Sequence, residues 1–489
     1  MILEPDLLAA YPAEDVVTAG AVAAAVVSSP RVLVVLDDDP TGTQSVCDLP
    51  VLTRWEAEDF RWAFSHRIGD RPAPAVYVMT NTRSLDPAEA AVRNREVVTY
   101  ALAAAAETGT RLGFVSRSDS TLRGHFPLEP DVIAATLAVA GRPTDGVVIV
   151  PAFPDAGRVT IGGVHYMRTD GGLTPVSETE FARDASFGFT SSELARYVEE
   201  KSAGRFSAAD VIVLDLAIIR GGADGIADAI DPATGSTPIV VDAVTENDLR
   251  ALALGLDEAE RRGKHLLYRV GPPFVRARIG QAERAPLSRD EAVAGTSPSA
   301  GGGLVVVGSH VGLTTHQLDD LVAHHPHAVV VELQVETLLD ETAAADHLTA
   351  TVAAVVGALA EADVILHTSR LLVRTDDPVE SLRIARTVSG AVVDIVRRTL
   401  AGRPPRFVVA KGGITSSDVA AHGLEIRHAI VRGPMLPGIV SLWEPVDGPA
   451  RGIPFVVFAG NVGGERSLTD VVAKLSAMLP GTARPSTDL

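Results

Sequence analysis

The sequence predicts an α/β protein of two domains, each a mostly parallel sheet flanked by helices. Three observations lead to this prediction. A chain of 489 residues is too long for one ordinary hydrophobic core. Short apolar runs alternate with helical segments, which is the pattern of a parallel sheet built from strand–helix–strand units. A segment rich in Gly, Ala, Ser, Thr and Pro, residues 292–303, separates two such patterns and is expected to be a linker.

The first domain is predicted to span residues 1–291. An alanine-rich segment, 87–106, has the periodicity of a helix, and Asp86 is expected to be its N-cap. Another helix is expected near 246–262. The strands are short apolar runs bounded by turn-forming residues, at 31–36, 75–79, 112–116, 146–150, 211–214 and 239–241. This order predicts an open sheet with helices on both of its faces.

The second domain, residues 304–489, begins directly after the predicted linker. Its strands are expected at 304–307, 328–333, 364–367, 406–410 and 455–458. Three of these strands are followed by a loop of small residues and then by a helical segment. The pattern therefore predicts a second sheet of the same general kind.

Composition excludes several classes of function. The net charge of −19 argues against a protein that binds duplex nucleic acid, because such proteins usually have a basic face. Cys47 is the only cysteine, so an intramolecular disulfide and a cysteine-based zinc site are excluded. No apolar run approaches twenty residues, and the first residues have no basic region typical of a signal peptide. We expect a cytoplasmic protein without membrane or nucleic-acid partners.

Polar segments follow the strands of the first domain at the point where each strand ends. They are residues 37–43, 80–84, 117–124 and 151–158. Ligands of open parallel sheets bind beyond the carboxyl ends of the strands, so these segments are expected to converge on one site. The arginines within them indicate that the ligand is a small anion. We expect the active site to lie in the cleft between the two domains.

Three consecutive aspartates, residues 37–39, come directly after the first strand. Carboxylates at this position suit coordination of Mg²⁺ or general-base catalysis on a hydroxyl group. Asp38 and Asp39 are the candidate catalytic residues, and the sequence does not separate the two roles. The same aspartates would also suit the capping of the next helix or the solvation of a loop.

The segment 117–123 combines two arginines, an aspartate and several hydroxyl groups within seven residues. Arg123 is expected to bind a carboxylate through two parallel hydrogen bonds, while Asp119 and Ser120 bind hydroxyl groups of the same ligand. A polar network that caps a helix is the alternative interpretation. Further positive charge is expected from equivalent loops and from the start of this segment, at Arg83, Arg117 and Arg158.

The three small-residue loops of the second domain are candidates for phosphate binding. They are residues 308–312, before a helix expected to open at Thr314 or Thr315, residues 411–417, before one over 418–422, and residues 460–464, before one from Ser467. Glycine lets the backbone approach a phosphate, and the start of a helix supplies free N–H groups. Any one loop taken singly fits a plain turn better, and it is the three together that favour phosphate binding. Neither a Walker-type P-loop nor the dinucleotide-binding glycine pattern is present.

Together these segments resemble the motifs of the four-carbon acid sugar kinase family. Residues 38–42 are similar to its DDxTG motif, with Pro40 at the variable position, and residues 119–124 to its DSTxRG motif. Residues 151–158, with His165 and Tyr166 after them, resemble its PAxPxxGR segment. Gly308 and Ser309, residues 412–415 and residues 460–464 resemble its nucleotide-binding segments, in the same order along the chain. Ile414 stands where the family often has an acidic residue.

This resemblance implies a sugar-acid-binding first domain and an ATP-binding second domain. It implies phosphorylation, by ATP with Mg²⁺, of the terminal O4 hydroxyl of a four-carbon acid sugar such as threonate, erythronate or 3-oxo-tetronate. The residues expected around the nucleotide are Ser309, Gly412, Gly413, Ile414, Thr415, Gly460 and Gly463. Two alternatives remain: a non-catalytic sensor of a sugar acid and a nucleotide, and a sugar-acid dehydrogenase, which the missing dinucleotide pattern disfavours. A homodimer is expected on general grounds.

Overall fold

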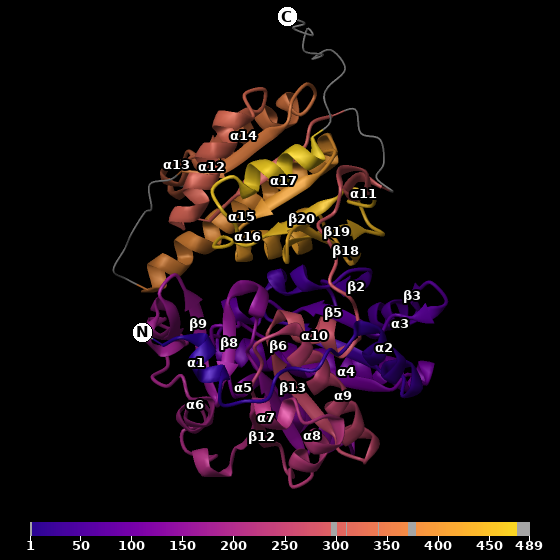
Figure 1. The fold of residues 1–489 in the computed structure, drawn as a ribbon. Coiled ribbons are helices and arrows are strands. Elements are labelled where there is room, and N and C mark those ends of the chain that lie inside the picture. The colour runs from indigo at the N-terminus through magenta and orange to yellow at the C-terminus, as the bar shows by residue number, and fades with distance from the viewer. Residues whose placement is uncertain (1, 295–300, 310, 341, 370–377, 477–489) are drawn as a thin grey trace, which may run out of the picture. The chain divides into compact units, whose positions relative to one another are not determined.

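A computed structural model describes residues 2–294, 301–309, 311–340, 342–369 and 378–476. The chain divides into two compact units, Met1–Arg284 and Ala285–Leu489, which we call the first and the second unit (Figure 1). The predicted boundary at residue 291 differs from this division. Leu287 and Ala292 are buried in the core of the second unit, and that is why residues 285–291 belong to it. Part of the predicted linker, 295–300, lies outside the described residues.

The first unit contains a sheet in which every paired strand is parallel to its neighbour, as the sequence predicts. The order across this sheet is β11-β12-β7-β13-β6-β1-β5-β2. In chain order the strands are β1 Val32–Asp37, β2 Leu49–Leu52, β5 Ala75–Met79, β6 Leu112–Arg117, β7 Gly146–Val150, β11 Ile212–Leu214, β12 Thr237–Val241 and β13 Leu266–Val270. The prediction missed β2 and β13.

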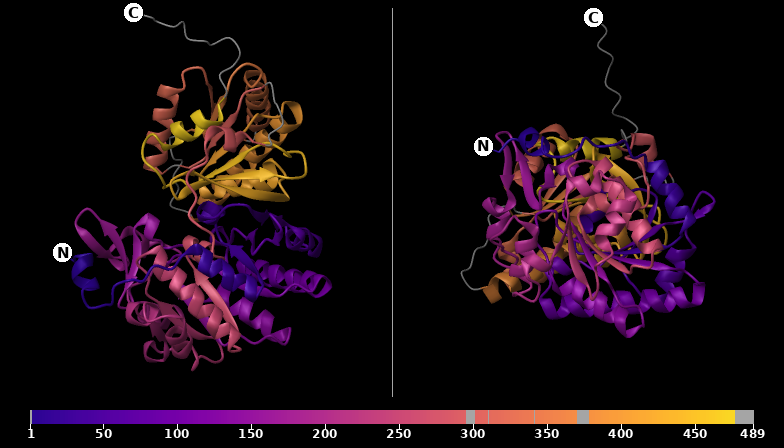
Figure 2. Two further views of the ribbon diagram at one scale, coloured as in Figure 1. Left: turned by 45° about the vertical axis from the view of Figure 1, so that its right-hand side comes forward. Right: turned by 60° about the horizontal axis from the view of Figure 1, so that its bottom comes forward.

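Helices cover both faces of this sheet (Figures 1 and 2). One face is covered by three helices in which α4 contacts the other two: α3 (Ala57–Ser65), α4 (Pro87–Thr108) and α5 (Leu128–Val139). The other face is covered by four helices in which α9 contacts the other three: α2 (Ala19–Ser28), α8 (Ala223–Ile230), α9 (Glu246–Arg261) and α10 (Pro272–Arg278). The predicted N-cap is confirmed, because the Asp86 carboxylate accepts a hydrogen bond from the backbone N–H of Glu89. The shorter helices of this unit are α1 Glu4–Leu8, α6 Leu194–Lys201 and α7 Leu216–Ile219.

The first unit also has a small antiparallel sheet of β8 (Arg158–Ile161), β9 (Val164–Thr169) and β10 (Gly172–Pro175). It follows β7 in the chain and has its own cluster of buried apolar residues, including Val159, Ile161 and Tyr166. A two-stranded hairpin, β3 Arg67–Ile68 and β4 Arg71–Pro72, completes the strands of the unit among the described residues.

The second unit has a mixed sheet in the order β18-β19-β20-β17-β14-β16-β15. The five strands from β20 to β15 are parallel, as predicted, and β18 and β19 form an antiparallel hairpin beside β20 that the prediction missed. The strands are β14 Leu304–Val307, β15 Val329–Leu333, β16 Val364–Thr368, β17 Val408–Lys411, β18 His428–Leu436, β19 Ile439–Pro445 and β20 Phe455–Phe458. The helices are α11 Arg289–Val293, α12 Gly312–His324, α13 Val335–Leu339, α14 Ala344–Ala358, α15 Pro378–Gly402, α16 Gly413–Asp418 and α17 Ser467–Leu475.

Among the described residues, no helix has both the length and the apolar character required to cross a membrane.

Candidate functional site

The topology of the first unit brings three of the predicted polar segments together. After β1 the chain first builds β2 and β5 on one side of it and then returns to form β6 on the other. A change of direction of this kind opens a crevice at the carboxyl ends of the strands, where open α/β sheets bind ligands. The crevice is flanked by Asp37–Asp39 after β1, Arg83 after β5 and the segment 117–124 after β6.

Asp37 and Arg117 form a buried ion pair at the base of this crevice. Arg117 also donates to the backbone carbonyls of Ser118 and Asp39, so its donors face the protein interior. Burial raises the pKa of Asp37 to about 7, an effect that the guanidinium opposes. A β-carbon on Gly42 would overlap both side chains of the pair, which explains why glycine occupies this position of the motif. Arg117 was expected to contact the substrate; the structure instead places it beneath the site as a support.

Asp38 is held by Arg83 through two hydrogen bonds. Its Oδ1 accepts from Nη2 at 2.6 Å and its Oδ2 from Nε at 3.2 Å, while Arg117 Nη2 lies 3.3 Å from the same Oδ1. The Asp38 side chain is 2% exposed, and burial raises its pKa. Gly124 has a φ of 112°, and a β-carbon there would lie 3.0 Å from Asp38 Oδ2. Asp38 is therefore enclosed, with both of its oxygens engaged.

Asp39 is the aspartate that remains accessible. Its Oδ1 accepts from the backbone N–H of Thr41 at 2.9 Å and from the Thr41 hydroxyl at 2.6 Å, so the carboxylate caps a 3₁₀ helix over Pro40–Ser45. Its Oδ2 has Arg83 Nη1 at 3.6 Å, and the side chain is 20% exposed. Burial would raise the pKa of Asp39, but Arg83, Arg117 and the bonds from Thr41 outweigh it and hold the pKa below its ordinary value. Asp39 therefore caps a helix, which was one of the two interpretations of these aspartates, while its side chain stays partly exposed.

The segment after β6 forms a second charged group next to these aspartates. Asp119 accepts from Arg123 Nε at 2.6 Å and from the Thr121 hydroxyl. Burial would raise the pKa of Asp119, but Arg83 and Arg123 lower it well below the usual range. Arg123 lies over the ring of Phe181 and has Asp184 at 3.7 Å. Arg123 also lines a small pocket together with Ser118, Tyr197 and other residues. We call Asp37, Asp38, Asp39, Arg83, Arg117, Asp119 and Arg123 the acid–arginine cluster.

Ser120 and Arg158 are placed by the small antiparallel sheet. His165 on β9 is buried, and its Nε2 lies 2.8 Å from the Ser120 backbone carbonyl while Nδ1 contacts the Thr160 hydroxyl at 2.9 Å. Burial lowers the pKa of His165 to about 4, so the ring is neutral. Arg158, the first residue of β8, donates to the Ala156 carbonyl and is close enough to Asp119 and Arg123 for their charges to act on it. Its Nε is buried and has no hydrogen-bond partner among the described residues.

The prediction missed a buried ion pair that supports the cluster from below. Arg269, on β13, pairs with Glu129 of α5, and Ser116 bonds to both of them. Glu129 also accepts from the Thr82 hydroxyl, which connects it to the loop that carries Arg83. A signal was available: Arg269 is a lone charge within the apolar run 266–270, and that run is followed by Gly and two prolines.

The second unit brings its three small-residue loops together in the same way. β14, β17 and β20 are adjacent parallel strands, and the chain changes direction between β14 and β17. A β-carbon on Gly308 would overlap the Thr415 side chain, and one on Gly412 would lie 3.0 Å from Thr415 Oγ1. Gly412 has a φ of 127°, which glycine adopts most readily. The loops after β14 and β17 are therefore in close contact.

The third loop, after β20, contacts the first through hydroxyl groups. Thr314 Oγ1 donates to the Gly460 carbonyl at 2.8 Å, and a β-carbon on Gly460 would lie 2.7 Å from Ser309 Oγ. The Gln317 amide donates to the Val462 and Gly464 carbonyls. Gly463, with a φ of 83°, turns the chain toward α17, where Ser467 accepts from the Gly464 N–H at 2.9 Å. We call Ser309, Gly308, Gly412, Thr415, Gly460 and Gly463 the glycine cluster.

Two helix starts differ from the prediction. The helix after the first loop begins at Gly312 rather than at Thr314 or Thr315, and the helix after the second begins at Gly413, so Gly413, Ile414 and Thr415 form its first turn. The segment predicted as a helix over 418–422 is a single π-helical turn, Val419–Gly423. Ile414 is 56% exposed. The predicted start at Ser467 is confirmed.

Lys411 ends β17 and is fully buried beside the glycine cluster. Its amine donates to the Ala459 carbonyl at 2.6 Å and lies 3.9 Å from the centre of the Phe458 ring. Among the described residues no carboxylate pairs with it. Burial lowers the pKa of Lys411 to about 7.

The two clusters differ in what they could hold. Within the described part of the chain, no group of three or more His, Cys, Asp or Glu side chains is arranged as a metal site. Mg²⁺ at kinase sites uses one or two carboxylates together with phosphate oxygens, so the partly exposed carboxylate of Asp39 suits either such an ion or a reacting hydroxyl group. The close backbones of the glycine cluster suit phosphate groups.

Two family models match the chain. Residues 33–278 match a sugar-binding N-terminal domain, and residues 304–468 match a nucleotide-binding C-terminal domain. The chain belongs to the four-carbon acid sugar kinase family. The two models fall on the two units, one on the unit with the acid–arginine cluster and the other on the unit with the glycine cluster.

One curated relative is a D-erythronate kinase of Heliobacterium modesticaldum, which is 31% identical over 247 residues. That alignment covers 50% of this chain and 49% of the relative, so the chain spans about half the length of the curated protein it matches. Among solved structures, one described as a putative tRNA synthase of Salmonella typhimurium has a TM-score of 0.66 at 18% identity, covering 91% of this chain and 100% of the other. A Haemophilus influenzae protein has a TM-score of 0.59 at 18% identity, covering 90% and 99%. These two likenesses show the fold.

Proposed function

We propose that this family member is an ATP-dependent kinase that phosphorylates the terminal O4 hydroxyl of a four-carbon acid sugar, with threonate, erythronate and 3-oxo-tetronate as candidates. The observation that carries the proposal is the acid–arginine cluster, in which the partly exposed carboxylate of Asp39 lies near arginines able to bind an acid. The relative described as a D-erythronate kinase supports the substrate class.

In the proposed reaction the substrate carboxylate binds Arg123 and Arg158. Arg123 is oriented by Asp119 and Phe181 and lines the small pocket, and Arg158 has a donor without a partner among the described residues. Asp119 and Ser120 lie in the same segment and would bind the hydroxyl groups of the acid. Such contacts hold the acceptor in one orientation, which supplies much of the catalysis in phosphoryl transfer.

Asp39 is the residue that we assign to the reacting hydroxyl. Asp38 has both oxygens bound to Arg83 and is enclosed, whereas the Asp39 side chain is partly exposed. As O4 bonds to the γ-phosphorus, the bond from that phosphorus to the ADP oxygen breaks, and the hydroxyl proton passes to Asp39. Mg²⁺ would neutralise charge on the triphosphate. Ser309, residues 412–415, Gly460 and Gly463 would surround the nucleotide, and the active site in the cleft between the two domains stays a prediction.

The proposal is tested by a coupled assay of ADP release with MgATP over threonates, erythronates and 3-oxo-tetronates. Erythritol, which has the hydroxyl groups but lacks the carboxylate, serves as the matched control compound. We expect turnover with at least one acid and very little with erythritol. If calorimetry shows that the acids bind while no ADP forms with any of them, the protein is a sensor and the kinase proposal is wrong.

A further inference from the structure

A second cavity lies in the first unit, at the opposite edge of its sheet from the acid–arginine cluster. Its volume is about 220 Å³, and it is lined by the first residues of β6, Leu112 to Phe114, and by Leu266 at the start of β13. β6 begins at this cavity with Leu112 and ends at Arg117. The two ends of an extended strand of this length are about 17 Å apart. The cavity is therefore separate from the crevice described above. None of the family motifs named in the sequence analysis includes the residues that line it.

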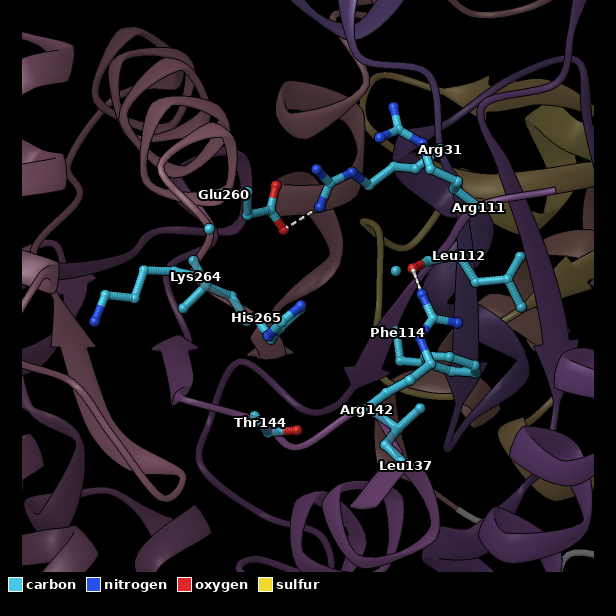
Figure 3. A pocket seen from close by; sticks show the side chains of 13 residues that line it. Arg31, Arg111, Leu112, Phe114, Leu137, Arg142, Thr144, Glu260, Lys264 and His265 are labelled. Carbon is cyan, nitrogen blue, oxygen red and sulfur yellow. Dashed lines mark hydrogen bonds and ion pairs between the residues drawn. The ribbon is translucent and has the colours of Figure 1, made fainter. Parts of the chain in front are cut away.

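The charge of this cavity is the reverse of the charge of the chain. Four cationic side chains and one carboxylate line it, although the chain has a net charge of −19. The carboxylate, Glu260, is neutralised from two sides, by Arg31 at 2.5 Å and by Arg278 at 2.6 Å. Lys264 points away from the other cations and donates to the backbone carbonyls of Asp231 and Ala233 (Figure 3).

Two arginines in the cavity have only neutral partners. Arg142 makes one long bond of 3.5 Å, to the Leu112 carbonyl. Arg111 donates to the Pro30 carbonyl at 3.2 Å and the Ser29 hydroxyl at 3.4 Å. Among the described residues neither guanidinium is paired with a carboxylate. Each therefore keeps its full charge and free N–H donors, which is the arrangement that binds an oxyanion.

The other walls restrict the kind of anion. Figure 3 shows His265 and Thr144 beside the space that Arg31 and Arg142 enter from different elements. Leu112, Leu137 and Phe114 supply an apolar surface between the polar groups. A pocket with an apolar wall and a few polar groups is typical of a site for a small organic molecule.

We propose that this cavity is a binding site for a small organic oxyanion, a phosphate ester or a carboxylate, which Arg111 and Arg142 bind through charged hydrogen bonds. The proposal does not depend on the reaction proposed above, because it concerns residues at the other edge of the sheet.

The test is calorimetric titration of the full chain with inorganic phosphate in one arm and succinate in the other. The variant is Arg111→Ala/Arg142→Ala, and the matched control is Arg95→Ala/Arg196→Ala, which removes two exposed arginines of the same unit. We expect one binding event to weaken by about tenfold or more in the variant and to be retained in the control. Binding of phosphate alone identifies a phosphate ester as the ligand, and binding of succinate alone identifies a carboxylate.

Equal affinity of the variant and the wild type for both probes would overturn the proposal, as would the absence of any binding up to about 10 mM in the wild type. Arg142→Ala alone serves the same purpose if the double variant does not fold, since Arg142 is exposed and makes a single weak bond. Turnover of the double variant should equal that of the wild type, which separates loss of this site from damage to the acid–arginine cluster.

Discussion

The two clusters both lie in loops that follow the parallel strands of their sheets. The first is made of charged side chains, and the second is made of glycines and hydroxyl-bearing residues. In the first unit the loops after β1, β5 and β6 are joined by ion pairs, and almost every charge there has a partner of opposite sign. In the second unit the loops after β14, β17 and β20 are joined by hydroxyl groups, backbone carbonyls and the close approach of glycines. Lys411, a buried cation beside them, contacts a carbonyl and an aromatic ring and has no carboxylate partner among the described residues.

This difference matches what each cluster would have to bind. Paired charges hold one another in fixed positions, so a small acid would bind to side chains that are already oriented. The entropic cost of ordering these side chains arises during folding and not during binding. Backbone N–H groups and helix starts suit phosphates, whose charge is spread over several oxygens. The same parallel-sheet edge can therefore serve two kinds of ligand, depending on the residues that follow its strands.

The largest effect on the first cluster is expected from Asp39→Asn. The amide oxygen can still cap the 3₁₀ helix through Thr41, so the protein should fold, but it cannot take the hydroxyl proton. We expect kcat to fall by about 10²–10⁴-fold, measured by ADP release. Asp215→Asn is the matched control, because Asp215 also caps a helix and follows β11, the edge strand that four other strands separate from β1. Turnover of Asp39→Asn near that of the wild type would remove Asp39 from the reaction.

A second effect concerns stability and tests the role of Gly42 in the first cluster. In Gly42→Ala the added methyl would overlap the Asp37–Arg117 pair, which is buried and confined. We expect the free energy of unfolding to fall by about 2–4 kcal/mol, measured by urea denaturation. Gly464→Ala, where the added methyl would have no neighbour within 4 Å, should change it by about 0.5 kcal/mol or less. Equal losses in the two variants would contradict this account of the motif glycine.

Arg123→Ala tests whether the charged cluster binds the acid. We expect KM for the acid to rise by about 10–100-fold, while the affinity for ATP stays unchanged. Arg205→Ala is a close control, because Arg205 also lies over a phenylalanine ring and pairs with an aspartate, at a site outside the cluster. If the KM for the acid is the same in both variants as in the wild type, Arg123 does not bind the substrate.

The last effect concerns Lys411 and appears as a dependence of stability on pH. The folded pKa is about 7 and the ordinary value is 10.5, so between these values the unfolded chain binds a proton that the folded chain does not. Wild-type stability relative to Lys411→Met should therefore rise with pH from about 7 to 10, by up to about 1.4 kcal/mol per pH unit, and stay constant below 7. Lys474→Met, in which another amine that donates to carbonyls is removed, is the control. A flat difference across this range would show that Lys411 is not held in the way the structure indicates.

The parts of the fold that the sequence predicted are those set by local pattern. Apolar runs bounded by turns identified β5, β7, β14 and β20 with their observed bounds, and Asp86 identified the start of α4. The hairpin of β18 and β19 was missed because Gly433 and Pro434 interrupt the first strand, where the pairing shifts between Val431 and Gly433. Neither residue is typical of a strand interior.

The sequence predicted which residues form the candidate site more fully than it predicted the contacts between them. The order of strands and polar segments was enough to bring Asp38, Arg83 and Arg123 to one edge of a sheet. Which carboxylate each arginine binds depends on contacts across many tens of residues, such as Arg83 with Asp38 and Arg269 with Glu129. Such pairings leave no local pattern, and so the sequence did not separate Asp38 from Asp39 or show that Arg117 is buried.

The small antiparallel sheet has a consequence for how proteins of this kind can diverge. Arg158 and His165, which contacts the Ser120 carbonyl, both belong to residues 158–175, whose apolar cluster is completed by Leu216 and Val244 from later in the chain. The aspartates that follow β1 belong to the main sheet and make no use of this segment. Changes in this segment, made together with the residues that complete its apolar cluster, would alter which acid is accepted while the carboxylate proposed to react is inherited unchanged, and chimeras that exchange both would test this in the laboratory.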